Sequence, residues 1–106
     1  MVARINAQLP WLCLQGSGGN WVAKCDPLGL TVQEETWAEL MEAIGETLDA
    51  VFKDLLASND LLTFLERHGW SLVGEVPTRP EDVQRFDVPF IPTMVGSDGF
   101  QTGIRQ

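Results

Sequence analysis

One segment, residues 36–56, limits the folds open to this chain more than any other. Its large apolar residues recur at steps of three and four, so they share one side of an α-helix. They are Trp37, Met41, Ile44, Leu48, Val51, Phe52 and Leu55. Thr36 followed by Glu39 matches a capping box, in which the hydroxyl and the carboxylate reciprocally satisfy free backbone N–H groups. The pattern predicts an amphipathic helix that packs on a sheet.

The opposite side of this predicted helix is acidic. Charged residues recur there at the same steps: Glu35, Glu39, Glu42, Glu46, Asp49 and Lys53. Residues 34–66 hold nine acids and one base, a balance of −8 that equals the net charge of the whole chain. Three interpretations stay open: a solvated face, a docking surface for a basic partner, or a metal site, although one helix face lacks a convergent cage of ligands. The candidate partner-binding residues are Glu35, Glu39, Glu42, Glu46 and Asp49.

Composition argues against several other classes of protein. The 106 residues are 44% apolar and 21% charged, which is typical of a globular protein that folds without a metal or disulfide framework. A net charge of −8 argues against direct nucleic-acid binding, because phosphate contacts need clustered Lys and Arg. The uncharged run between Arg4 and Lys24 is interrupted by polar residues and glycines, so we expect no membrane span. Two cysteines and no leader-like segment indicate a cytoplasmic protein.

The first third of the chain has the alternation and turn signals of β-strands. The predicted strands are residues 2–14, 21–25 and 28–32. Pro10 predicts a bulge or an edge position in the first strand. The sequence Gln-Gly-Ser-Gly-Gly-Asn at 15–20 predicts a tight turn, and Asp26-Pro27 predicts a second turn. We expect a three-strand antiparallel meander.

Both faces of the predicted hairpin are largely apolar. One face carries Trp11, Cys13, Trp21, Ala23 and Cys25. The other carries Leu12, Leu14 and Val22. A sheet with one solvated face alternates apolar and polar residues, so we expect the second face to be covered by a later segment, a second copy or a partner. We therefore expect a homodimer or tetramer.

The second half of the chain predicts two further elements. Residues 60–68 form a short helix that ends at His68-Gly69, and residues 70–73 form a fourth strand. We interpret residues 1–74 as one α+β domain of order β-β-β-α-α-β, with the long helix on the sheet.

Beyond Gly74 the composition changes. Four of the six prolines lie in residues 75–106, which we expect to form a Pro-rich arm. The arm has an edge strand near 86–90, because a proline interrupts its alternation, and a mobile tail at 95–106.

Reactive side chains are few. Cys13 and Cys25 are either a redox or nucleophilic pair or two small buried side chains, and no neighbouring Lys, Arg or helix N-terminus favours a thiolate. His68 is either a general base or a residue that stabilises a helix end. The glycines at 16–19 are not followed by a helix, so they predict a turn and no phosphate-binding loop. We expect no enzyme, no cofactor and no metal.

Several motifs cluster before residue 56. They are Trp21-Val22-Ala23-Lys24-Cys25-Asp26-Pro27-Leu28-Gly29-Leu30, then Val32-Gln33-Glu34-Glu35-Thr36, then Glu39-Leu40 and Ala43-Ile44. Together they resemble the HicB-like antitoxin family over about residues 3–56, with Glu34 where that family commonly has Gly. The resemblance implies a partial ribonuclease-H-like fold of a three-strand meander, a helix and a fourth strand.

The resemblance also implies a function. HicB-like antitoxins are non-catalytic and neutralise a small basic toxin that cleaves messenger RNA. Members that act as repressors add a DNA-binding module, and residues 75–106 do not look like one, so we expect no direct nucleic-acid binding. Residues 61–70 resemble the opening of such toxins, but no Gly-Ser-His motif follows them. The alternatives are an orphan oligomeric scaffold or interaction protein without a toxin, and a small hydrolase acting through His68 or the cysteines.

Overall fold

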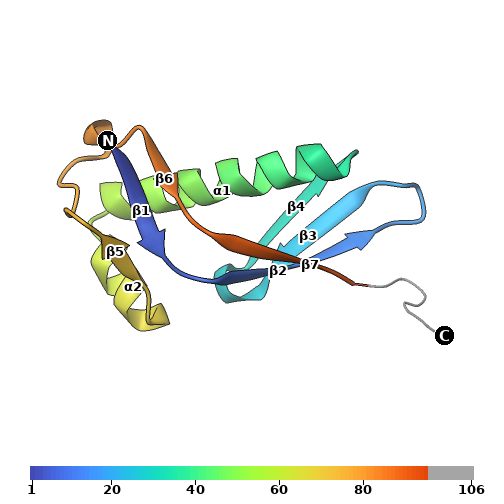
Figure 1. The fold of residues 1–106 in the computed structure, drawn as a ribbon, viewed down its shortest axis with the longest axis horizontal. Coiled ribbons are helices and arrows are strands. Elements are labelled where there is room, and N and C mark those ends of the chain that lie inside the picture. The colour runs from blue at the N-terminus through green and yellow to red at the C-terminus, as the bar shows by residue number, and fades with distance from the viewer. Residues whose placement is uncertain (96–106) are drawn as a thin grey trace. The chain divides into compact units, whose positions relative to one another are not determined.

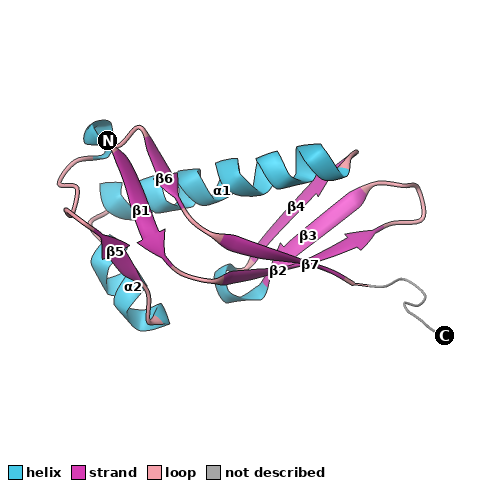
Figure 2. Ribbon diagram, viewed as in Figure 1, coloured by secondary structure: helices cyan, strands magenta, loops and turns pink. Residues whose placement is uncertain are grey.

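The computed structural model describes residues 1–95, and within them the chain has the predicted α+β class, with two helices and seven strands. In chain order the elements are β1 (Val2–Asn6), β2 (Leu9–Gln15), β3 (Trp21–Cys25), β4 (Leu30–Glu34), α1 (Trp37–Ala57), α2 (Leu61–His68), β5 (Ser71–Val73), β6 (Arg85–Asp87) and β7 (Phe90–Met94) (Figures 1 and 2). Short 3-10 turns lie at Asp26–Leu28 and Pro80–Asp82.

The chain folds as two compact units. Unit 1 contains Met1–Gln8 and Gly45–Pro89, and unit 2 contains Leu9–Ile44 and the chain from Phe90 onward. Each unit has a sheet of its own, and α1 contributes its first part to unit 2 and its remainder to unit 1.

The sheet of unit 2 has four strands in the order β4-β3-β2-β7. The antiparallel meander β2-β3-β4 is present as predicted, with Leu14 opposite Val22 and Ala23 opposite Val32. The glycine-rich turn closes the β2–β3 hairpin, where the Gly16 N–H donates to the Asn20 carbonyl at 2.7 Å. The fourth strand, β7, runs parallel to β2.

The sheet of unit 1 has three strands in the order β5-β1-β6. β5 is antiparallel to β1 and β6 is parallel to it, so Arg4 lies between Val73 and Asp87. α2 packs beside β5 in this unit (Figure 1).

The predicted single strand over 2–14 is two strands, β1 and β2, with different neighbours. Alternate residues are buried without a break from Ala3 to Cys13, so the pattern carries no mark of the change of sheet. Pro10 lies beyond the β2–β3 register, where β2 has only β7 beside it. This is a local edge position, which a residue without an N–H tolerates.

The later strands differ most from prediction. The strand expected at 70–73 is β5, and it pairs with β1 in unit 1 and not with the meander. The strand expected near 86–90 is two edge strands, β6 and β7, interrupted at Val88-Pro89. The third strand of the meander starts two residues late, because Asp26–Leu28 form a 3-10 turn that Gly29 ends at a left-handed φ of 64°. Apart from Val95, the tail predicted at 95–106 lies outside the described residues.

The long helix agrees closely with the prediction of 36–56. The Glu39 N–H donates to Thr36 Oγ1 at 3.1 Å, as a capping box requires. The Thr36 hydroxyl donates a hydrogen bond to Glu39 Oε1 at 2.9 Å, in place of the capping-box bond between that carboxylate and a backbone N–H. The most deeply buried residues of α1 recur at steps of four: Ile44, Leu48 and Phe52 of the predicted stripe, and Leu40, which the stripe did not include. The other members of the stripe are half-buried: Trp37, Met41, Val51 and Leu55.

Each unit has its own apolar core. In unit 2, Trp21 and Trp37 meet edge to face at 4.9 Å between ring centroids, which attaches the start of α1 to β3. In unit 1, the Phe52 ring lies 5.9 Å from both Phe64 and Phe86, so α2 and β6 pack on the same helix residue. Neither helix of the described part of the chain has the length and apolar character needed to cross a membrane.

Candidate protein-binding surface

Four of the five candidate partner-binding residues are exposed. Glu35 lies between β4 and α1, and Glu39, Glu42 and Glu46 follow along the solvated side of α1. Glu39 has a second role, since its carboxylate and its N–H belong to the helix cap. Carboxylates near a helix N-terminus also stabilise the helix through its dipole, so part of this acidity serves α1 itself.

Asp49, the fifth candidate, has a different environment. Its Oδ1 accepts the Phe86 N–H at 2.6 Å, and its Oδ2 lies 3.0 Å from Lys53 Nζ. Lys53 also donates to the Gln84 carbonyl at 3.0 Å. Only 22% of the Asp49 side chain is exposed. The Asp49–Lys53 pair therefore attaches the start of β6 to α1 within unit 1, and it leaves Asp49 little freedom to bind another molecule.

The sequence alone did not reveal this role of Asp49. The spacing of four between Asp49 and Lys53 predicts an ion pair along the helix. The partners that matter most are the main-chain groups of Gln84 and Phe86, more than thirty residues away in the chain. No local pattern marks a main-chain N–H that needs an acceptor.

A free sheet edge lies next to the acidic residues of unit 2. β4 is the outer strand of its sheet, so among residues 1–95 one row of its backbone N–H and C=O groups has no strand beside it. β4 contains neither proline nor lysine, the residues that most often block such edges. It ends at Glu34 and leads directly to Glu35 and the start of α1. Unit 2 thus combines a strand edge with exposed carboxylates.

The two thiols belong to the core of unit 2. Cys13 and Cys25 are both free and fully buried. Burial raises the pKa of both thiols; for Cys25 a backbone hydrogen bond from Leu28 opposes this and the charge of Asp26 adds to it. Cys13 lies opposite Ala23 in the β2–β3 register, so the two cysteines are not directly paired across the strands. A protonated, enclosed thiol is a poor nucleophile, and the environment of both residues fits a packing role.

His68 stabilises the end of α2. Its Nδ1 lies 3.0 Å from the Phe64 carbonyl oxygen, and its ring stacks on Trp70 at 4.5 Å between centroids. Gly69 follows with a left-handed φ of 72° and closes the helix, as the His68-Gly69 pair predicted. Among the described residues, the only side-chain hydrogen bond of His68 is to main chain, and none joins it to a carboxylate or a nucleophile.

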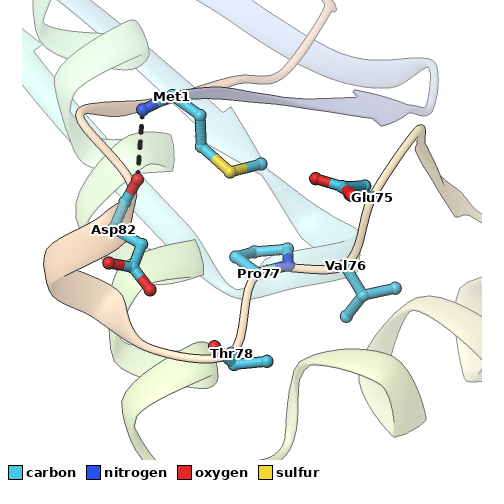
Figure 3. Close-up of a pocket in the computed structure, with 6 residues that line it drawn as sticks. All are labelled: Met1, Glu75, Val76, Pro77, Thr78 and Asp82. Atoms are coloured by element: carbon cyan, nitrogen blue, oxygen red, sulfur yellow. Dashed lines mark hydrogen bonds between the residues drawn. The ribbon is translucent and has the colours of Figure 1, made fainter.

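A surface pocket of about 430 Å³ lies at the N-terminal end of unit 1 (Figure 3). Its walls come from Met1, Asp82 and the segment Glu75–Thr78. The Met1 amino group donates to the Asp82 carbonyl oxygen at 3.1 Å. The Asp82 carboxylate is already paired with Arg79 at 3.0 Å, and that hydrogen bond and charge raise the pKa of the Arg79 guanidinium. The pocket therefore offers Glu75 as its one carboxylate without such a pair, and no base–nucleophile set.

Within residues 1–95, no group of three or more His, Cys, Asp or Glu side chains is arranged to hold a metal ion. Comparison of the chain with protein-family models, with curated proteins and with solved structures gives no match. The described residues place exposed carboxylates beside a strand edge.

Proposed function

We propose that this protein is a non-catalytic, antitoxin-type binding protein that takes a small basic partner on the acidic surface of unit 2. Glu35, Glu39 and Glu42 carry the negative charge, and β4 supplies a strand edge beside them. The partner class, a small basic ribonuclease, follows from the resemblance to the HicB-like family.

The observation that carries this proposal is the exposure of these carboxylates next to an unpaired edge. A patch of one charge steers an oppositely charged protein and raises its association rate, most strongly at low salt. A free strand edge then offers main-chain hydrogen bonds to an incoming strand. Neither feature is needed to fold unit 2, except for the role of Glu39 in the cap.

The topology of unit 2 agrees with part of what the resemblance implies. The HicB-like resemblance implies a meander, then a helix, then a fourth strand. Unit 2 has the meander β2-β3-β4 followed by the first part of α1, but the strand predicted at 70–73 is β5 of the other sheet, and the strand that joins the meander is β7, parallel to β2. A likeness of topology alone supports a fold and leaves the partner to experiment.

The absence of catalysis is part of the proposal. Cys13 and Cys25 are enclosed, and His68 is engaged with main chain and with the Trp70 ring. These are the three residues on which a small hydrolase would depend. Two unpaired thiols in the core also favour a cytoplasmic location, because reducing conditions keep thiols free.

The test is capture of proteins from the source cell on the full-length chain at low and high salt. Wild type should retain a small basic protein at low salt and release it at high salt. The double variant Glu35→Lys/Glu42→Lys should lose it, while Glu39 stays in place to preserve the helix cap. The matched control Glu66→Lys/Glu81→Lys changes two exposed acids of unit 1 and alters the net charge equally.

If no small basic protein is retained, or if the two double variants behave alike, the docking surface is wrong. One observation favours the second candidate, an orphan oligomeric scaffold: the outer face of the four-stranded sheet is apolar and exposed. The reading frame next to this gene separates the two, because a small basic product there is expected of an antitoxin and not of an orphan scaffold.

A further inference from the structure

The outer face of the four-stranded sheet carries exposed apolar side chains that are not part of the core. Leu12 and Leu14 of β2 are 46% and 43% exposed, and Ile91 and Val95 are 49% and 42% exposed. A shallow groove of about 210 Å³ lies on this face. Its lining residues are Leu12, Leu14, Val22, Lys24 and Val95.

The strand register arranges these side chains in rows across the sheet. Leu14 lies between Val22 of β3 and Val95, whose N–H donates to the Cys13 carbonyl and extends the β7–β2 ladder. In the next row, Leu12 lies between Lys24 and Thr93. On β4 the rows continue with Gln33 beside Val22 and Thr31 beside Lys24. The first row is therefore apolar across its three positions on β3, β2 and the β7 side, and the second contains one charge, Lys24, between hydroxyl-bearing and apolar residues.

The charge on this face is unusual for the chain. None of the outward-facing strand residues is acidic, although the chain has fifteen acids and a net charge of −8. The nearest acids in the chain are Glu34, which pairs with Trp21 on the other face of the sheet, and Asp26, in the turn after β3. Two chains of this charge repel one another, and an acid-free apolar face lets them approach with the least repulsion.

We propose that this face binds the same face of a second copy, forming a two-sheet sandwich. The charge selects one arrangement. A two-fold axis along β2 places Lys24 of one copy over Thr93 of the other and Val22 over Val95, because β3 and β7 flank β2 on opposite sides. An axis across the strands at Leu12 would bring the two Lys24 ammonium groups together. Sheets packed face to face with nearly aligned strands are a common arrangement.

The size of the face sets the strength of the dimer. About this axis three strands of each copy, β3, β2 and β7, face one another; at about 4.8 Å apart and about five residues long they cover roughly 14 by 17 Å. An interface of this size belongs with small, transient contacts, so the dissociation constant is expected in the micromolar range. This inference does not depend on the proposed basic partner, which uses the acidic residues and the β4 edge.

The test is analytical ultracentrifugation of the full-length chain at about 1 to 500 µM. Wild type should shift from monomer to dimer over this range, and Leu14→Lys or Leu12→Lys should weaken the dimer at least tenfold by placing a charge in its centre. The matched control is Val73→Lys, which changes a 57%-exposed valine on the three-stranded sheet and should leave the dimer unchanged. Circular dichroism of each variant verifies that it is folded.

Disulfide trapping tests the axis. A mixture of Lys24→Cys and Thr93→Cys chains should form a crosslinked dimer under mild oxidation, and Lys24→Cys alone should not. Efficient crosslinking of Lys24→Cys to itself would overturn the axis along β2.

Three results would overturn the dimer itself. They are a wild-type chain that stays monomeric at 500 µM, an effect of Val73→Lys equal to that of Leu14→Lys, and dimerisation that appears only in a chain shortened after Val95. The last would assign the face to residues 96–106. The variant Glu35→Lys/Glu42→Lys should dimerise at least as strongly as wild type, because its lower net charge reduces the repulsion, so failure of the basic-partner proposal leaves this test intact.

Discussion

The two sheets of this protein have similar inner faces and very different outer faces. The outer face of the three-stranded sheet mixes polar and charged residues, with Arg4 Nε 3.9 Å from Asp87 Oδ2 and Asn6 beside Ser71. The outer face of the four-stranded sheet has Leu12, Leu14 and Val95 in adjacent rows.

The difference shows that exposure of one side chain says little about its role. Val73 is more exposed than Leu12, at 57% against 46%, yet it lies beside Arg4 in a polar setting. Leu12 is followed on the same face by Leu14, which lies between Val22 and Val95, and these side chains form a continuous apolar surface. An isolated exposed valine is ordinary, whereas a contiguous apolar face indicates a contact.

The largest expected effect tests whether the inner faces are equally essential. Ile5 is 2% exposed on the inner face of the three-stranded sheet, and Ile5→Ala should lower the free energy of unfolding by about 2–5 kcal/mol through lost burial and a cavity. Val2→Ala, on the outer face of the same strand, should change the free energy of unfolding by less than about 0.5 kcal/mol. Urea denaturation measures both. Similar losses for the two variants would refute the assignment of inner and outer faces.

A smaller effect concerns how β6 is held in the three-stranded sheet. Asp49→Ala removes the acceptor for the Phe86 N–H and the carboxylate beside Lys53, so it should cost about 1–3 kcal/mol of unfolding free energy. Amide hydrogen exchange at Phe86 should accelerate with it.

The control for Asp49 is Glu46→Ala on the same side of α1, where the side chain is exposed and forms no side-chain hydrogen bond within the described part of the chain. Glu46→Ala should lower the free energy of unfolding by less than about 0.5 kcal/mol. Equal costs for Asp49 and Glu46 would mean that the acids of α1 share one role, contrary to the structure.

The third effect concerns the inner face of the four-stranded sheet and depends on pH. Burial raises the pKa of Cys13 and Cys25 above the ordinary value of 9.0, so from about pH 9 upward the unfolded chain loses thiol protons that the folded chain keeps. Below about pH 9 the two thiols therefore do not change the free energy of unfolding with pH. Above about pH 9 they lower it, by at most about 1.4 kcal/mol per pH unit for each thiol.

Denaturation of wild type and of Cys13→Ala/Cys25→Ala between pH 7 and 11 measures this slope. The double variant starts from lower stability because it loses packing, and its stability should fall less steeply with alkaline pH. If the unfolding free energies of the two proteins fell with the same slope, the thiols would have the same pKa in the folded and unfolded chains. That result would contradict the full burial of both thiols.

Local signals predicted the local structure well. Thr36 and the apolar stripe marked the start and the buried side of α1, and the run at 15–20 marked the β2–β3 turn. His68-Gly69 marked the end of α2. Each of these features depends on residues within a few positions of one another, so a short window of sequence contains all of its physics.

Strand pairing was predicted less well, because it depends on distant residues. The alternation from Ala3 to Cys13 is unbroken although β1 and β2 belong to different sheets. Nothing local to residues 70–73 distinguishes pairing with β1 from pairing with the meander. In residues 85–94, Pro89 marked an interruption, but the parallel pairing of β6 with β1 and of β7 with β2 required both ends of the chain.

The candidate surface divides in the same way. The acidic row on α1 followed from helical periodicity alone, and the exposure of Glu35, Glu39, Glu42 and Glu46 agrees with it. The separate role of Asp49 was invisible in the sequence, because its acceptor oxygen serves a main-chain N–H thirty-seven residues away.

By itself, the sequence determined which segments coil, which extend, where the tight turns fall and where the negative charge gathers, since these follow from side-chain periodicity and backbone preference. The tertiary structure decided which strands become neighbours, which acid is used to hold a strand, and which apolar side chains stay open to solvent. Those outcomes are set by free-energy differences between contacts far apart in the chain, and such differences leave no periodic trace in the order of its residues.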